Sequence, residues 1–140
     1  MKLDGESGDN AVLARVMMET FGPSMSPSWF DNLDDQVVLE LPYGPSIGIP
    51  ERIEGKDAAR AMFQSVIDSF GLRFTDIEIF EMLDPSMVVV TYRGSGSAGD
   101  HPYNQRYVCL LKFREGRLLF YREYFDNKVL ADIMAHVNLS

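Results

Sequence analysis

Two glutamates are the side chains of this sequence best suited to moving protons in apolar surroundings. Glu123 lies in the predicted strand Arg117 to Tyr124, on the same side as Tyr121, and Glu40 is the single charge in Gln36 to Leu41. A carboxylate among apolar and aromatic side chains loses hydration, so its pKa rises and it can exchange protons near neutral pH. If both glutamates face one cavity in unequal environments, one can donate a proton while the other accepts it.

Each glutamate also has a structural interpretation. Glu123 can form an ion pair with Arg122, Arg106 or Lys112 that ties neighbouring strands together. Glu40 can lie at the rim, bonded to a tyrosine or an arginine, because charged strand residues usually stay solvated. Perturbed carboxylates mark functional sites only in a share of cases, so both interpretations remain open at this point.

The remaining polar chemistry is sparse. His101 follows a glycine-rich segment and is either a proton carrier at a cavity mouth or an exposed loop residue, and His136 lies near a helix end. Cys109, central in a predicted strand, is expected to be a small buried side chain. One cysteine and two histidines supply few soft metal ligands, and no glycine-rich phosphate loop or dinucleotide fingerprint is present. We therefore expect neither a metal nor a cofactor.

The composition narrows the class of protein further. The chain has 140 residues, of which 46% are hydrophobic and 24% charged, with a formal charge of -8. These values are typical of one soluble domain, and so acidic a chain is a poor match for nucleic acid or an anionic membrane surface. No apolar run approaches the roughly 20 residues of a membrane-spanning helix. The single cysteine and the absence of a secretory signal at the start favour a reducing cytoplasm.

Hydrophobic periodicity predicts the elements that must position these residues. The spacing of apolar residues predicts a helix over about 11–21 and a stronger one over 56–70, with Gly71 as its C-cap. Ser26-Pro27 opens a short helix between them. After the second helix the period changes to two, as in strands. The predicted strands cover 36–41, 74–83, 87–94, 103–114 and 117–124, with loops over 42–50 and 95–101 and a last helix from about 126.

This order predicts an α+β fold, in which a cone-shaped, curved antiparallel sheet is closed by the N-terminal helices around an apolar cavity. We expect one domain over 11–137 and a disordered tail over 1–10. On the inward faces, Met62, Val66, Gln105, Tyr107 and Tyr121 are expected to line the cavity, or to serve first as core. Trp29 and Phe30 either roof the cavity or pack the short helix on the first one.

Three motifs give the chain a resemblance to known proteins: Gly55 to Ala59 opening the long helix, Glu115 to Leu118 at the last hairpin, and Arg122 to Asp126 before the final helix. Together with the element order, they resemble the nuclear transport factor 2-like superfamily over roughly residues 11–135. More narrowly the chain is similar to its SnoaL-like group of small cyclases, isomerases and hydrolases. The resemblance implies a cone-shaped α+β fold, but a fold alone does not imply a function.

Comparison with ketosteroid isomerase, a worked case of carboxylate chemistry, argues against that reaction. The segment Leu41 to Gly44, which contains Tyr43, is similar to a Pro-Phe-Gly segment of that enzyme. The resemblance places the base at Leu41, the oxyanion tyrosine near Val16 and the protonated aspartate near Cys109. None of these residues can play its role here, although Tyr43 is kept as an expected binding residue.

The resemblance to limonene-type epoxide hydrolases implies a different set of catalytic positions. Their water-activating aspartate corresponds to Glu123, so a carboxylate is retained. Their arginine and second aspartate correspond to Val90 and Tyr92, and their water-holding tyrosine and asparagine to Val38 and Glu40. The relay of that family is therefore incomplete, while Val38 and Val90 become expected binding residues.

Phenazine-biosynthesis A/B proteins imply the same carboxylate. Their pocket glutamate corresponds to Glu123, whereas their helix histidine corresponds to Met62. Beside Glu123, Tyr92 is an expected catalytic residue, because it corresponds to a catalytic residue of the hydrolases. Its phenol, like the phenol of Tyr107 and the amide of Gln105, can hold a carbonyl or enolate oxygen.

Two functions follow as expectations. The first is a cofactor-independent enzyme in which Glu123, with Glu40 or Tyr92, moves a proton on a small apolar carbonyl, enol or epoxide compound by isomerisation, cyclisation, hydration or elimination. The second is a non-catalytic ligand-binding or dimerisation module with the same cavity. A homodimer is expected in either case, because apolar positions on the outer sheet face exceed what few helices can cover.

Overall fold

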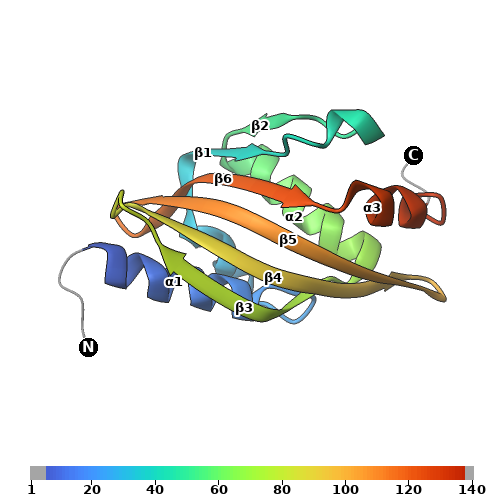
Figure 1. Cartoon of the computed structure of the whole chain (residues 1–140), viewed down its shortest axis with the longest axis horizontal. Coiled ribbons are helices and arrows are strands. Elements are labelled where there is room, and N and C mark those ends of the chain that lie inside the picture. The colour runs from blue at the N-terminus through green and yellow to red at the C-terminus, as the bar shows by residue number, and fades with distance from the viewer. Residues whose placement is uncertain (1–5, 138–140) are drawn as a thin grey trace.

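One curled, open sheet organises the chain, with its helices gathered mainly on one face (Figure 1). The computed structural model describes residues 6–137, and their side chains from Asp9 onward. Strand order across the sheet is β2-β1-β6-β5-β4-β3. The strands are β1 Leu33–Glu40, β2 Arg52–Glu54, β3 Arg73–Glu81, β4 Met87–Ala98, β5 His101–Arg114 and β6 Arg117–Phe125. The helices are α1 Glu6–Thr20, α2 Lys56–Phe70 and α3 Asn127–Met134, with short 3-10 turns η1 Pro27–Asn32 and η2 Pro45–Ile47.

The expected α+β architecture is confirmed, with one difference in the sheet. Strands β3 to β6 form consecutive antiparallel pairs, as the alternating pattern predicts. β1, however, runs parallel to β6, with Glu40 beside Arg122. The chain therefore joins the two by way of α2 and the long hairpins. Register shifts in β1, β3 and at the β5–β6 pair add twist and help the sheet to curl.

The concave side of the sheet carries the core. Alternate residues of β5 are buried on this side, and α1 and α2 pack against it. The β5 residues are Tyr103, Gln105, Tyr107, Cys109, Leu111 and Phe113. On β6, the register shift near the hairpin turns Leu118 rather than Leu119 inward, with 1% of its surface exposed. A strict period of two is broken there by the irregular pairing.

Helix α2 begins and ends at the residues expected from the sequence. Gly71 closes it in a left-handed conformation, its N–H bonded to the carbonyl of Ile67. Helix α1 begins at Glu6, within the segment expected to be a disordered tail. Asn10 in this extra turn is buried, and its side chain donates a hydrogen bond of 3.2 Å to the carbonyl of Pro85. Residues 1–5 of the expected tail lie outside the described residues.

The structure corrects two of the loops predicted from the sequence. The proline-rich segment after β1 contains η2, and the short β2 that follows it was not expected. The glycine-rich segment 95–101 is mostly strand, since β4 extends to Ala98 and β5 begins at His101, with Gly99 at the turn. At Gly96, a β-carbon would lie 2.3 Å from the carbonyl oxygen of Phe70. The small residue therefore permits close approach of α2. No helix among residues 6–137 is long and apolar enough to cross a bilayer.

Candidate functional site

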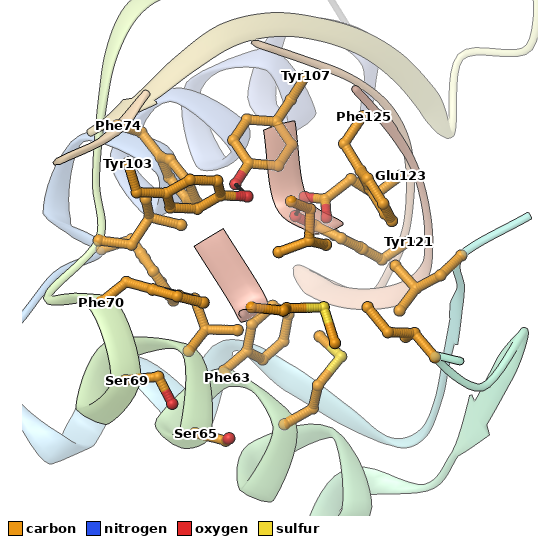
Figure 2. A pocket seen from close by; sticks show the side chains of 18 residues that line it. Phe63, Ser65, Ser69, Phe70, Phe74, Tyr103, Tyr107, Tyr121, Glu123 and Phe125 are labelled. Carbon is orange, nitrogen blue, oxygen red and sulfur yellow. Dashed lines mark hydrogen bonds between the residues drawn. The ribbon is translucent and has the colours of Figure 1, made fainter. Parts of the chain in front are cut away.

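An apolar cavity of about 190 Å³ lies between the concave sheet, α2 and α3 (Figure 2). Helix α2 forms one wall with six residues, among them Ser65 and Ser69, and α3 contributes Leu130 and Met134. The sheet supplies aromatic side chains from β3, β5 and β6. These are Phe74, Tyr103, Tyr107, Tyr121 and Phe125.

Among the lining residues within 6–137, Glu123 is the one ionisable carboxylate. The alternation of β6 turns it inward with Tyr121 and Phe125, as expected. The hydroxyl of Tyr92 donates a hydrogen bond of 2.7 Å to Glu123 Oε2, and the hydroxyl of Tyr121 donates to the same oxygen. The two phenol oxygens are themselves 3.0 Å apart. Both tyrosines are buried, so the carboxylate is anchored at one oxygen by two groups of the core.

The other oxygen of Glu123 is left for the cavity. Within residues 6–137, Oε1 has no protein hydrogen-bond partner, yet it is not enclosed by protein atoms. Glu123 as a residue is half-buried, and it belongs to the lining of the cavity. The ion pairs considered for Glu123 with Arg122, Arg106 or Lys112 are not formed in the described part of the chain.

Burial sets the protonation of this cluster. Loss of hydration raises the pKa of Glu123, while the hydrogen bonds from Tyr121 and Tyr92 oppose the rise. Burial and the neighbouring Glu123 charge raise the pKa of Tyr92 and Tyr121 well above that of a free phenol. Both phenols therefore stay protonated and act as donors. Burial also raises the pKa of Cys109, which keeps its thiol protonated and unreactive.

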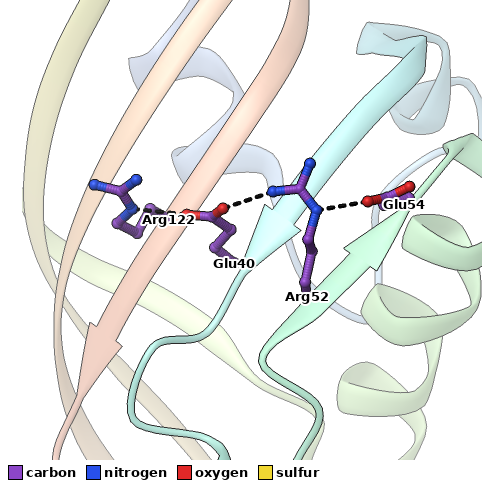
Figure 3. Close-up of polar contacts among 4 residues, drawn as sticks. All are labelled: Glu40, Arg52, Glu54 and Arg122. Carbon is purple, nitrogen blue, oxygen red and sulfur yellow. Dashed lines mark hydrogen bonds and ion pairs between the residues drawn. The ribbon is translucent and has the colours of Figure 1, made fainter.

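Glu40 is not part of this cluster, and its expected pairing with Glu123 is wrong. Val37 and Leu39 of β1 are fully buried on the concave side, so Glu40 lies on the outer face. There it bonds Arg122 Nε and Arg52 Nη1, each at 2.8 Å, and Arg52 also bonds Glu54 (Figure 3). The structural interpretation of Glu40, a glutamate bonded to an arginine, is the one the structure shows.

The other expected binding residues divide between the cavity and the rest of the fold. Met62, Val66, Tyr107 and Tyr121 line the cavity. Gln105 is buried beside it. There it holds the start of α3, because its amide bonds both the N–H and the carbonyl of Asp126.

Five residues lie elsewhere. Trp29 and Phe30 are core residues rather than a roof, and the indole of Trp29 donates to the carbonyl of Met17 at 3.1 Å. Val90 is fully buried in the core, outside the lining. Val38 shares the outer face with Glu40. Tyr43 is 55% exposed and packs on the ring of Tyr124.

The structure adds lining residues that were not expected. Tyr103 and Phe125 lie on the same strand faces as Tyr107 and Glu123, so alternation alone could have found them. Leu130 and Met134, spaced by four on α3, could not, since the sequence does not show which element α3 contacts. His101 lies outside the lining, where its ring stacks on His136 with centroids 3.6 Å apart.

Comparisons with known proteins identify the family and agree with the fold. The family model described as a SnoaL-like domain matches residues 8–121. The chain belongs to the SnoaL-like domain family. The SnoaL-like resemblance is thereby confirmed, and the chain shares its fold with a solved nuclear transport factor 2-like protein.

Three proteins similar to this SnoaL-like domain come from bacteria. A PhzA/B-like protein of Pseudomonas aeruginosa is 31% identical over 100 residues, which is 70% of each chain. A Bacillus subtilis protein solved under the name "Putative Isomerase" has a TM-score of 0.83 and 26% identity, covering 97% of this chain and all of its own. A phenazine biosynthesis-related protein of Pseudomonas aeruginosa has a TM-score of 0.77 and 17% identity, covering 92% and 86%. Similarity of the last kind shows the fold alone.

Proposed function

We propose that this SnoaL-like domain is a cofactor-independent enzyme in which Glu123 moves a proton on a small, mostly apolar substrate. A carbonyl, enol or epoxide compound is the substrate class, and isomerisation, cyclisation, hydration or elimination is the reaction class. One observation carries the proposal: a carboxylate with a raised pKa has one oxygen fixed by two phenols and the other open to an apolar cavity. The isomerase name of the Bacillus subtilis relative is consistent with it.

The two oxygens of Glu123 have different roles in this proposal. Oε2 already accepts two hydrogen bonds, so the proton of the neutral acid resides on Oε1 and points toward the substrate. Once Oε1 has given up this proton, the phenols of Tyr92 and Tyr121 stabilise the carboxylate left behind, which can then accept a proton as a base. Glu123 thus acts as the acid at one stage of a turnover and as the base at another.

The test compares two glutamates of the same chain. Glu123→Gln keeps the shape of the side chain but cannot exchange a proton, whereas Glu40→Gln changes a carboxylate on the outer face. On a substrate found by screening carbonyl, enol and epoxide compounds, Glu123→Gln is expected to lower kcat about 100-fold or more. Glu40→Gln is expected to leave kcat nearly unchanged. Full turnover by Glu123→Gln would remove Glu123 from the mechanism.

A non-catalytic binding module is the second candidate. It is favoured by the lining itself, in which no second carboxylate and no histidine accompanies Glu123 among the described residues. In that case, native mass spectrometry of protein purified from its host would find a bound small molecule. After incubation, the released molecule would be chemically unchanged. Conversion of the molecule in solution would exclude this candidate.

A further inference from the structure

A second polar group faces the cavity from β5. Tyr103 and Tyr107 both line it, with their hydroxyl oxygens 3.5 Å apart and directed toward one another in Figure 2. Across the sheet, Tyr107 lies opposite Phe125, so Glu123 is its diagonal neighbour on the same face. Diagonal neighbours of this kind are roughly 7–8 Å apart. The phenol pair and Glu123 are therefore separate polar points within reach of one small molecule.

The Tyr103–Tyr107 pair has more hydroxyl protons than acceptors. The amide of Gln105 donates to the hydroxyl oxygen of Tyr103 at 3.1 Å, and the one contact between the two hydroxyls can use only one of their two protons. No other acceptor for either hydroxyl occurs within residues 6–137. Burial raises the pKa of both tyrosines, and the Glu123 charge adds to the rise, so the protons stay in place. At least one O–H is thus left without an acceptor beside the cavity.

Gly94 fixes where the Tyr107 ring lies. A β-carbon at this position would lie 2.7 Å from Tyr107 Cε2 and 3.0 Å from Leu72 Cδ1. On its other side the Tyr107 ring stacks on Tyr92, with centroids 4.8 Å apart and planes 15° apart. The ring is held from both sides, so its hydroxyl has a fixed position rather than a range of them.

The cavity also limits the size and charge of its ligand. A cavity of about 150 Å³ accepts benzene, so about 190 Å³ leaves room for one ring with a few substituents. No lysine, arginine or histidine is among the lining residues that the structure describes. An anionic ligand would lose its hydration without gaining a positive countercharge, which is costly. A cationic ligand would need the ionised form of Glu123, which the raised pKa of this carboxyl disfavours.

We propose that Tyr103 and Tyr107 form an anchor that donates a hydrogen bond to the carbonyl oxygen of an uncharged, single-ring ligand. The inference rests on the proposed function, since it names the substrate class of the same cavity. Glu123 then meets a second atom of that ligand, on the β6 side. Tyr103 and Tyr107 set specificity for the oxygen, and Glu123 supplies the proton.

The test uses two probes of nearly equal shape. Acetophenone carries a carbonyl oxygen where α-methylstyrene carries a CH₂ group, so the ratio of their affinities reports the hydrogen bond. We would titrate both into the ¹⁵N-labelled full chain by NMR, for the wild type and for the double variant Tyr103→Phe, Tyr107→Phe. The double variant is expected to lower the preference for acetophenone about five- to tenfold, since one hydrogen bond is lost. If its spectrum shows unfolding, Tyr107→Phe alone is compared, with a smaller loss expected.

Three results would overturn the anchor. One is an unchanged preference in the folded Phe variants, another is no binding of acetophenone to the wild type. The third is benzoate binding as tightly as acetophenone at pH 8, where benzoate is ionised. An unchanged preference together with loss of turnover in Glu123→Gln would reject the anchor and leave the acid–base proposal standing. Retained turnover in Glu123→Gln with a lost preference would do the reverse.

Discussion

At the scale of single residues, Glu123 links the site to the stability of the fold. Its pKa is raised by burial, so the folded state binds the proton more tightly than the unfolded state, in which the pKa is near 4.5. The stability from this group is fully present below that value and is lost as the pH rises through the folded pKa. Each unit of difference corresponds to about 1.4 kcal/mol.

Replacing Glu123 by Gln should remove this pH dependence. The neutral amide does not ionise, so the variant is expected to gain stability relative to wild type as the pH rises from about 4 to 9. Urea unfolding of both proteins across this range would measure the difference, and subtracting the curves cancels the other carboxylates. A constant difference at all pH values would contradict the raised pKa.

The phenols beside Glu123 offer a second prediction. Tyr121→Phe removes a donor that stabilises the carboxylate, so the pKa of Glu123 should rise further, by about one to two units if one charge-assisted hydrogen bond is lost. A ¹³C NMR titration of the Glu123 carboxyl carbon would follow the change. Tyr124→Phe is the matched control, since Tyr124 lies on the outer face and should leave the titration where it is.

The sequence, read with its family resemblance, could predict the place of Glu123 but not that of Glu40. Both glutamates occupy alternating strands, and alternation tells which neighbours share a face without telling which face is concave. In β6 both faces carry aromatic residues, and the resemblance to known families, whose pocket carboxylates correspond to Glu123, indicated which face lines the cavity. Around Glu40, Val37 to Leu39 and Leu41 make both faces of the chain apolar, and only the curvature of the sheet shows that Glu40 points outward.

At the scale of elements, the close contact between α2 and β4 shapes the cavity wall. Gly96→Ala would place a β-carbon 2.3 Å from the Phe70 carbonyl oxygen, so the end of α2 must move away. We expect a loss of about 1–3 kcal/mol in unfolding free energy, together with weaker binding of acetophenone, because Ser69 and Phe70 line the cavity. Ser95→Ala, an exposed neighbour, is the control. Equal stability of the two variants would show that α2 yields without cost.

Elements with a clean period were predictable and those held by distant partners were not. The helix over 56–70 shows apolar spacing and a glycine cap, and its bounds match. Segment 95–98 looks like a loop from its glycines and serines, yet it is strand, because pairing with β5 and contact with α2 outweigh local propensity. The parallel β1–β6 pair joins residues 82 apart in sequence at Glu40 and Arg122, which no local pattern reveals.

At the scale of the whole molecule, the homodimer remains a prediction, and the outer sheet face is where we expect it to form. Phe80 and Val108 on this face are 51% and 42% exposed, and Val108 pairs across the sheet with Tyr124. We propose that a second copy covers this face. Light scattering after size exclusion should give about twice the 15.8 kDa of one chain, and Val108→Lys should shift the protein toward the single-chain mass. A wild type that elutes as one chain at micromolar concentration would refute the dimer.

The one-sided setting of Glu123 has a consequence for any product formed in the cavity. Among the described lining residues the one carboxylate, Glu123, reaches the cavity from β6, while the wall on α2 offers aliphatic, aromatic and hydroxyl side chains. A flat enol lying between these walls would receive its hydrogen on one of its two faces. Where the new centre is chiral, one mirror-image form of the product would therefore be made in excess, and chiral chromatography would distinguish it from a racemate.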